Sequence, residues 1–81
     1  FNSRILILGA GGASRGIIEP LMEQSPSHIV IANRTVEKAL ALSTEFTQLG
    51  EISGSGYDAI KNQQFDLILN ATSASLTGEL P

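Results

Sequence analysis

The chain has 81 residues, of which 42% are hydrophobic and 16% charged, and its formal net charge is −3. This is the length of one small domain with the composition of a globular protein, and the negative charge argues against nucleic acid as the main partner. The lack of cysteine excludes disulfides and thiolate metal sites, and the lack of an apolar run of about 20 residues excludes a membrane span.

The first predicted strand covers residues 3–8 and leads directly into a glycine-rich segment. Its almost wholly apolar sequence is typical of a strand buried on both faces. Apolar residues then recur at helical spacing and predict a helix over about residues 12–25, with Pro20 inside it. A buried strand that turns through glycines into a helix is the setting in which such a motif binds a dinucleotide.

Individual positions of the glycine-rich segment have distinct expected roles. Gly9 would make the tight turn, and Gly11 would let the backbone approach a pyrophosphate held by free N–H groups at the helix start. Ser14 takes the third position of the G-x-G-x-x-G/A pattern, where its hydroxyl is expected to hydrogen-bond a phosphate. A Walker-type phosphate loop is excluded because Ile17 stands where the lysine is required. A glycine-rich turn without a ligand is the alternative to a dinucleotide site.

A second buried strand is predicted at residues 28–32, with His28 at its start and without a catalytic role. An amphipathic helix follows over residues 36–47, with Thr35 or Asn33 as its N-cap. The single histidine and the scattered carboxylates show no metal-ligand spacing, so we expect no metal site.

The rest of the chain continues the alternation of strands and helices. We expect a short strand at residues 51–53 that runs into a flexible glycine-rich stretch, a helical turn at 57–61, a strand at 65–69 and a polar loop at 70–75. The pattern predicts an α/β fold, namely a truncated, doubly wound parallel sheet of the Rossmann type with right-handed crossovers.

The residues after the second strand indicate which dinucleotide is bound. Domains that bind NAD carry an acidic residue about 20 positions past the glycines, where it bonds the ribose 2′-hydroxyl. Here that place holds Asn33, Arg34 and Thr35, with Lys38 one helical turn on, and these groups suit a 2′-phosphate. We therefore predict NADP; a capped helix start with solvated charges is the alternative. Arg15, Arg34 and Lys38 all lie at predicted helix starts, which suggests a polyanion between them.

Three segments together resemble the NADP-binding domain of the shikimate dehydrogenase family: residues 9–16, 33–39 and 66–73. The resemblance implies that the first segment holds the pyrophosphate and the second surrounds the adenosine 2′-phosphate, and that Thr72 and Ser73 lie beside the nicotinamide. The family usually has glycine where Ser75 stands. The implied cofactor-binding residues are Gly9, Ala10, Gly11, Gly12, Ala13, Ser14, Asn33, Arg34, Thr35, Lys38, Thr72 and Ser73.

The resemblance also implies an activity, the NADPH-dependent reduction of 3-dehydroshikimate to shikimate in aromatic amino-acid (chorismate) biosynthesis. The substrate-binding residues and the catalytic Lys–Asp pair of the family lie in a separate N-terminal domain. Residues 1–81 are thus expected to be a partial NADP-binding domain that is inactive alone and holds no catalytic residue. We interpret Lys61 as a surface charge and Asp66 as a strand-start cap.

Two other functions compete with this interpretation. One is the nucleotide domain of a glutamyl-tRNA reductase, which has similar glycine and Asn-Arg-Thr motifs, and the other is a non-catalytic NADP-binding module. The loop from Asn70 to Ser73 and the pair Gly78 and Glu79 favour the first interpretation.

The expected setting of the chain follows from the same features. We expect a cytoplasmic protein without a signal peptide, whose partner is a small-molecule substrate bound mainly by the missing domain. Because the chain ends before any strand pairs beyond residues 65–69, we expect the 81 residues to self-associate or to be only marginally stable.

Overall fold

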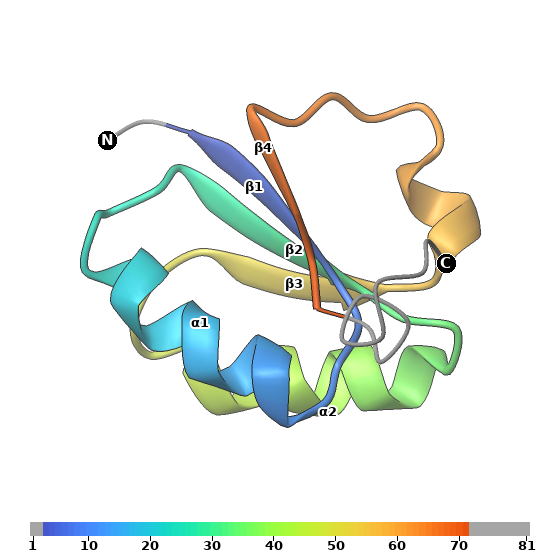
Figure 1. Ribbon diagram of the computed structural model, residues 1–81, viewed down its shortest axis with the longest axis horizontal. Helices are drawn as coiled ribbons and strands as arrows, with labels where there is room; N and C mark the ends of the chain where they lie inside the picture. Colours follow the sequence, from blue (N-terminus) through green and yellow to red (C-terminus); the bar gives the residue numbers. More distant parts are fainter. Residues whose placement is uncertain (1–2, 72–81) are drawn as a thin grey trace.

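The computed structural model describes residues 3–71, which form four parallel strands, two α-helices and one 3₁₀ turn (Figure 1). In chain order the elements are β1 (Arg4–Leu8), α1 (Gly12–Met22), β2 (His28–Ala32), α2 (Val36–Phe46), β3 (Ile52–Ser55), η1 (Tyr57–Ile60) and β4 (Leu67–Asn70).

The strands lie in the order β3-β2-β1-β4, and every neighbouring pair is parallel. Leu6 of β1 lies opposite Val30 of β2 and Ile68 of β4, so β1 is central although it comes first in the sequence. This order confirms the predicted doubly wound topology of the Rossmann type.

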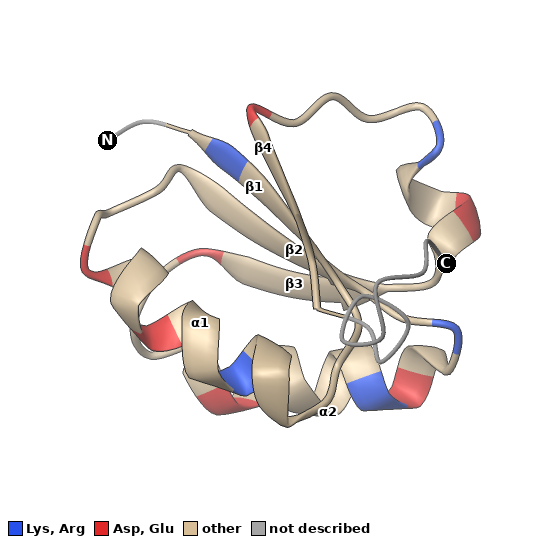
Figure 2. Cartoon of the chain, in the orientation of Figure 1, with Lys and Arg blue, Asp and Glu red and all other residues tan. Residues whose placement is uncertain are grey.

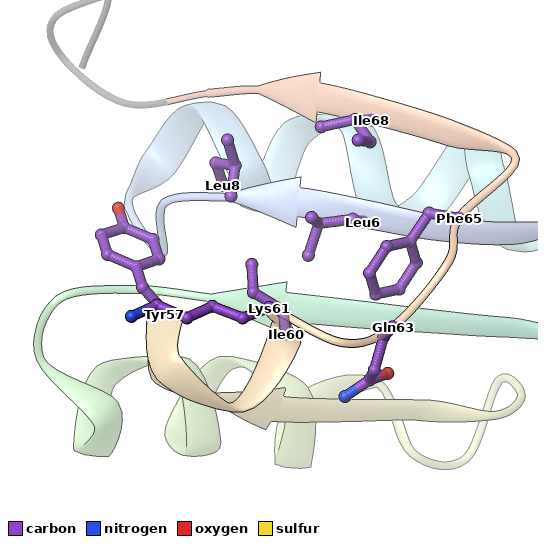
Figure 3. Close-up of a pocket in the computed structure, with 8 residues that line it drawn as sticks. All are labelled: Leu6, Leu8, Tyr57, Ile60, Lys61, Gln63, Phe65 and Ile68. Atoms are coloured by element: carbon purple, nitrogen blue, oxygen red, sulfur yellow. The ribbon is translucent and has the colours of Figure 1, made fainter.

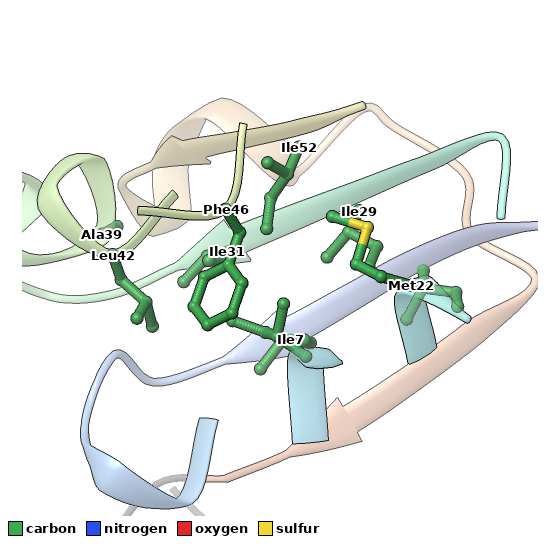
Figure 4. Close-up of a cluster of buried hydrophobic side chains, with 10 residues drawn as sticks. Ile7, Met22, Ile29, Ile31, Ala39, Leu42, Phe46 and Ile52 are labelled. Atoms are coloured by element: carbon green, nitrogen blue, oxygen red, sulfur yellow. The ribbon is translucent and has the colours of Figure 1, made fainter. Parts of the chain in front are cut away.

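One face of the sheet packs against both helices (Figure 1). Alternate strand residues point to this face, and they meet the apolar sides of α1 and α2 in the main core (Figure 4). The largest fully buried side chains of this core are isoleucines, and all but Ile18 of α1 lie on strands, which β-branched residues favour. They are Ile5, Ile7, Ile18, Ile29 and Ile31.

The opposite face carries no α-helix in the described part of the chain. Leu6, Val30 and Ala32 form a smaller buried cluster there, with Ile60 of η1 and Phe65 packed against it. Arg4 fixes the segment before β4 across this face. Its guanidinium donates to the backbone oxygen of Gln64 at 3.0 Å and to Gln63 Oε1 at 2.8 Å, and it lies 5.0 Å from the centre of the Phe65 ring.

Two predicted boundaries were wrong in ways that have a physical cause. Helix α1 ends at Met22 instead of residue 25, because Gln24 N–H and Ser25 N–H bond carbonyls three residues back and Ser25 takes a left-handed φ of 52°. Strand β3 extends through Gly54 and Ser55, which we had expected to be flexible. A Cβ at Gly54 would lie 2.4 Å from the backbone oxygen of Ala39 in α2, so this glycine permits close packing.

The last strand is also shifted, because it covers Leu67–Asn70 where residues 65–69 were predicted. Phe65 instead packs its ring over the sheet face. Thr35 occupies the N-cap position of α2 as one of the two expected residues, but its side chain makes no capping hydrogen bond. The amide of Asn33 instead donates to the backbone oxygen of Thr35 at 3.1 Å.

Candidate functional site

The turn between β1 and α1 is built on Gly9. Its φ of 104° lies in the region that only glycine adopts without strain. Its N–H donates to the carbonyl of Ala32, the last residue of β2, at 2.7 Å. The end of β1 and the end of β2 are thereby tied together at the carboxyl edge of the sheet.

The start of α1 is open on its outer side. A Cβ added at Gly11 or Gly12 would meet no atom within 4 Å, so packing within the described chain does not require glycine at either position. The first turn of α1 contains no acidic residue, and its N-cap Gly11 supplies no side chain. The N–H groups of Gly12, Ala13 and Ser14 precede the first intrahelical bond of the helix, so this end can accept an anion.

The side chain of Ser14 points inward. The residue is fully buried, and its hydroxyl donates to the carbonyl of Gly9 at 2.6 Å. Our expectation that this hydroxyl bonds a phosphate therefore does not fit the structure. A small residue is needed here because the helix passes close to the strand, which is also the reason for a glycine or alanine at this position. The neighbouring Ala10 packs partly buried against the main core.

The segment after β2 lies beside the glycine turn because Leu8 and Ala32 are paired in register. Asn33 is anchored by its N–H, which donates to the carbonyl of Ser55 at 3.1 Å. Arg34, Thr35 and Lys38 are exposed, and the two cations lie in the loop before α2 and in its first turn (Figure 2). Neither Arg34 nor Lys38 forms an ion pair within residues 3–71.

Arg15 differs from the other two cations expected around a polyanion. Its guanidinium forms an ion pair with Glu45 of α2, so its charge is already matched. The hydrogen bond from Arg15 lowers the pKa of Glu45, and the same bond raises the pKa of Arg15. Of these three cations, Arg34 and Lys38 are the two without an ion pair in the part of the chain that the structure describes.

The end of β4 reaches the same edge of the sheet. Ala71 N–H donates to the carbonyl of Leu8 at 2.9 Å, which aligns the end of β4 with the glycine turn. Thr72 and Ser73, which we expect near the nicotinamide, lie outside the described residues.

Other charged groups have structural roles, as expected. Lys61 pairs with Asp58 at 3.1 Å on the surface. Asp66 Oδ2 accepts the N–H of Arg4 at 2.8 Å, at the amino edge of the sheet and so at the far end from the site. The described residues contain no cluster of three or more potential metal ligands. Within the same residues no helix is long and apolar enough to cross a membrane.

The structure adds Ser55 to the neighbourhood of the site. Its carbonyl accepts the Asn33 N–H, while its Oγ is buried without a partner in the described structure. Sequence analysis missed this residue because strand β3 was predicted to stop two positions earlier. The sequence carries no signal that would have revealed it, since serine beside glycine is typical of loops.

The fold defines a parallel α/β unit of the Rossmann type. The protein family described as Shikimate / quinate 5-dehydrogenase matches residues 1–77. The chain therefore belongs to the shikimate / quinate 5-dehydrogenase family, as the resemblance of its motifs indicated.

Individual relatives agree with this assignment. The chain is 57% identical over 80 residues to a "Shikimate dehydrogenase (NADP(+))" of Methylococcus capsulatus, and 53% identical over 80 residues to one of Cellvibrio japonicus. Each alignment covers 99% of this chain and 29% of the relative. A crystal structure of an Ael1 enzyme from Pseudomonas putida superimposes with a TM-score of 0.86 at 51% identity, over 99% of this chain and 29% of that one.

The chain thus spans under a third of the length of these relatives. Their names do not favour the alternative of a glutamyl-tRNA reductase domain, nor that of a non-catalytic module.

Proposed function

We propose that the chain is the NADP-binding part of a shikimate dehydrogenase, which reduces 3-dehydroshikimate to shikimate with NADPH in aromatic amino-acid biosynthesis. The observation that carries the proposal is the juxtaposition, at one edge of the sheet, of an open glycine turn and two cations that form no ion pair among residues 3–71. The names of the relatives support both the reaction and the cofactor.

The residues at this edge fit the two charged parts of NADP. The backbone of Gly9 to Ser14 would hold the pyrophosphate, with open space beside Gly11 and Gly12 for its approach. The 2′-phosphate would lie among Asn33, Arg34, Thr35 and Lys38, where no acidic residue takes the place that selects NAD. Ser14 contributes its N–H only, since its hydroxyl is bonded to Gly9.

When bound, NADPH supplies a hydride to the carbonyl carbon of the substrate. The residues of this chain bind and orient the cofactor and perform no proton transfer. Asn33 would be held in place by its bond to Ser55, so that the loop keeps its shape in the absence of ligand. We assign Thr72 and Ser73 to the nicotinamide side, and we place substrate binding and proton transfer in another domain of the full-length protein.

Titration calorimetry of the 81-residue chain with NADP and with NAD tests the proposal. We expect NADP to bind more tightly than NAD, and we expect no reduction of NADP when shikimate is added. Equal affinity for the two cofactors would contradict the assigned 2′-phosphate site, and turnover by this chain alone would contradict the assignment of catalysis to another domain.

Gly11→Ala is a suitable control for the pyrophosphate site. The added methyl group meets no protein atom within 4 Å, so the thermal transition should be unchanged while affinity for both cofactors falls. We also propose a cytoplasmic location, with which the lack of cysteine agrees.

A further inference from the structure

Tyr57 lies at the same edge of the sheet as the glycine turn. Ser55, Ala32 and Leu8 pair in one row across the sheet, and Tyr57 follows two residues after this row as the first residue of η1. It is 38% exposed, and it lines an apolar groove together with Leu8. Figure 3 shows its ring directed away from η1 toward the carboxyl end of β1. An exposed aromatic ring is thus placed beside the proposed cofactor site.

Two contacts hold the start of η1 against the start of α2. The carbonyl of Ser55 accepts the N–H of Asn33 at 3.1 Å, which joins the end of β3 to the loop before α2. A Cβ at Gly56 would lie 2.9 Å from Cγ2 of Val36, so the backbone before Tyr57 packs closely on the first residue of α2. The fold therefore fixes this tyrosine near the loop that precedes α2.

The covalent structure of NADP brings its adenine to the same loop. One ribose carries the 5′-pyrophosphate, the 2′-phosphate and, on C1′, the adenine. The proposed function, on which this inference rests, assigns the pyrophosphate to the glycine turn and the 2′-phosphate to Arg34 and Lys38. Because C1′ and C2′ are bonded to each other, the adenine then also lies beside residues 33–35.

The two faces of the sheet differ at this edge. On one face α1 and α2 begin, and their apolar sides fill the main core. On the other face lies the groove, which is lined there by Leu8 and Tyr57. The flat faces of an adenine ring are suited to the second side, where the base can stack on an aromatic side chain.

The other aromatic side chains within residues 3–71 lie elsewhere. Phe46 is 8% exposed in the main core. Phe65 lies over the guanidinium of Arg4, at the end of β1 that is opposite to the glycine turn. We propose that Tyr57 stacks on the adenine of the bound dinucleotide and contributes affinity for NADP and NAD alike.

This role differs from that of the two cations. A stacked ring contacts the base, which both cofactors share, whereas Arg34 and Lys38 would bind a phosphate that NAD lacks. Loss of the ring should therefore lower both affinities by the same factor and leave the preference for NADP unchanged. The stacking of one base on an aromatic side chain corresponds to roughly five- to a hundredfold in affinity.

The composition of the chain permits an optical test. Tyr57 is the single tyrosine and the chain has no tryptophan, so its tyrosine fluorescence reports on this ring alone. In a dilute solution of the 81-residue chain, adenosine 2′,5′-bisphosphate should quench the emission in a saturable way, because a stacked base contacts the ring. Inorganic pyrophosphate, which has no base, should leave the emission unchanged. Emission is corrected for absorption by the nucleotide.

Substitutions separate the ring from its hydroxyl. In titration calorimetry, Tyr57→Ala should lose roughly five- to a hundredfold in affinity for both NADP and NAD, and Tyr57→Phe should stay within about twofold of the wild type. Phe65→Leu is the matched control, because it removes a ring from the same face of the sheet away from the site. It should leave both affinities unchanged. Circular dichroism verifies that each variant is folded.

The outcomes distinguish this inference from the proposed function. Binding of NADP without quenching, or wild-type affinities in Tyr57→Ala, would overturn the stacking and leave the proposed function intact. An equal loss in Tyr57→Phe would assign the effect to the hydroxyl and also overturn the stacking. A loss confined to NADP would overturn it by placing the ring at the 2′-phosphate. Failure of the wild type to bind NADP would overturn the proposed function, and this inference with it.

Discussion

Ser14 occupies the third position of the glycine-rich motif, but its hydroxyl does not have the phosphate-binding role that a serine there suggests. The hydroxyl in the third position of the glycine pattern bonds a carbonyl of the turn, and the residue is fully buried. Its bond to Gly9 links the start of α1 to the left-handed turn, so it stabilises the shape of the loop. At this position the side chain supports the backbone, whose N–H groups stay available for the pyrophosphate that we propose to bind there.

Arg34 should determine which cofactor is preferred. Hydrogen bonds to a charged group contribute about 1.5–3 kcal/mol, so we expect Arg34→Ala to weaken NADP binding about ten- to a hundredfold. Binding of NAD should be nearly unchanged, because NAD has no 2′-phosphate. Titration calorimetry with both cofactors measures the difference.

Lys61→Ala is the matched control for Arg34→Ala, since it removes the same charge from a surface pair with Asp58 on η1. It should leave both affinities unchanged. Equal losses of NADP and NAD affinity in Arg34→Ala would place this side chain at the pyrophosphate or in the scaffold.

At the scale of single elements, local patterns predicted the type of each strand and helix that the structure describes, and the errors at β3 and Arg15 came from contacts between distant segments. The glycines at positions 54 and 56 read as a flexible stretch because glycine is common in loops. In the structure Gly54 is part of strand β3, and the backbone of α2 approaches it more closely than any side chain would permit. Likewise Arg15 was assigned to a ligand, and its partner Glu45 lies 30 positions away on another helix.

Gly54→Ala tests the contact between β3 and α2. The methyl group would lie 2.4 Å from a backbone oxygen, so we expect a loss of about 1–3 kcal/mol in the free energy of unfolding. Thermal denaturation should show a midpoint lower by roughly 5–20 °C. Gly16→Ala is the control, because a Cβ there meets nothing within 4 Å and should raise stability by about 0.5–1 kcal/mol. A wild-type midpoint in Gly54→Ala would contradict the close packing.

The ion pair between α1 and α2 makes stability depend on pH. The pKa of Glu45 is lower in the folded state than in the unfolded chain, so its contribution is complete above the unfolded value of about 4.3 and is lost as the pH falls through the lower folded value. We expect the midpoint of thermal unfolding of the wild type to lie slightly above that of Glu45→Gln at pH 7, and we expect this difference to disappear in acid. Both side chains are about half exposed, so salt should also reduce the difference. A difference that persists at low pH would assign the effect of the substitution to packing.

For the whole molecule, the exposed side of β4 should govern association. No strand pairs with its outer side in the part of the chain that the structure describes, and Leu67 and Ile68 are 39% and 58% exposed. Such an edge promotes pairing with other chains, so we expect the 81 residues to self-associate as concentration rises. Sedimentation velocity at several concentrations measures this. Ile68→Lys should reduce association, whereas Leu49→Lys should not. A concentration-independent monomer with a sharp thermal transition would contradict the prediction.

The bonds that join Arg4 to Asp66 also bear on the order in which the protein folds. The backbone and side chain of Asp66 meet the backbone of Arg4 across 62 positions of sequence, so β1 receives its second neighbour only when β4 has been synthesised. Closing such long loops is slow, because the entropy of closure is lost before the contacts form. In pulse-labelling hydrogen exchange during refolding, we expect the amides shared by β1 and β2 to be protected before those shared by β1 and β4. On the ribosome, the nascent chain would then form the half of the sheet that carries the residues we propose for the 2′-phosphate before the half that we propose to lie toward the nicotinamide.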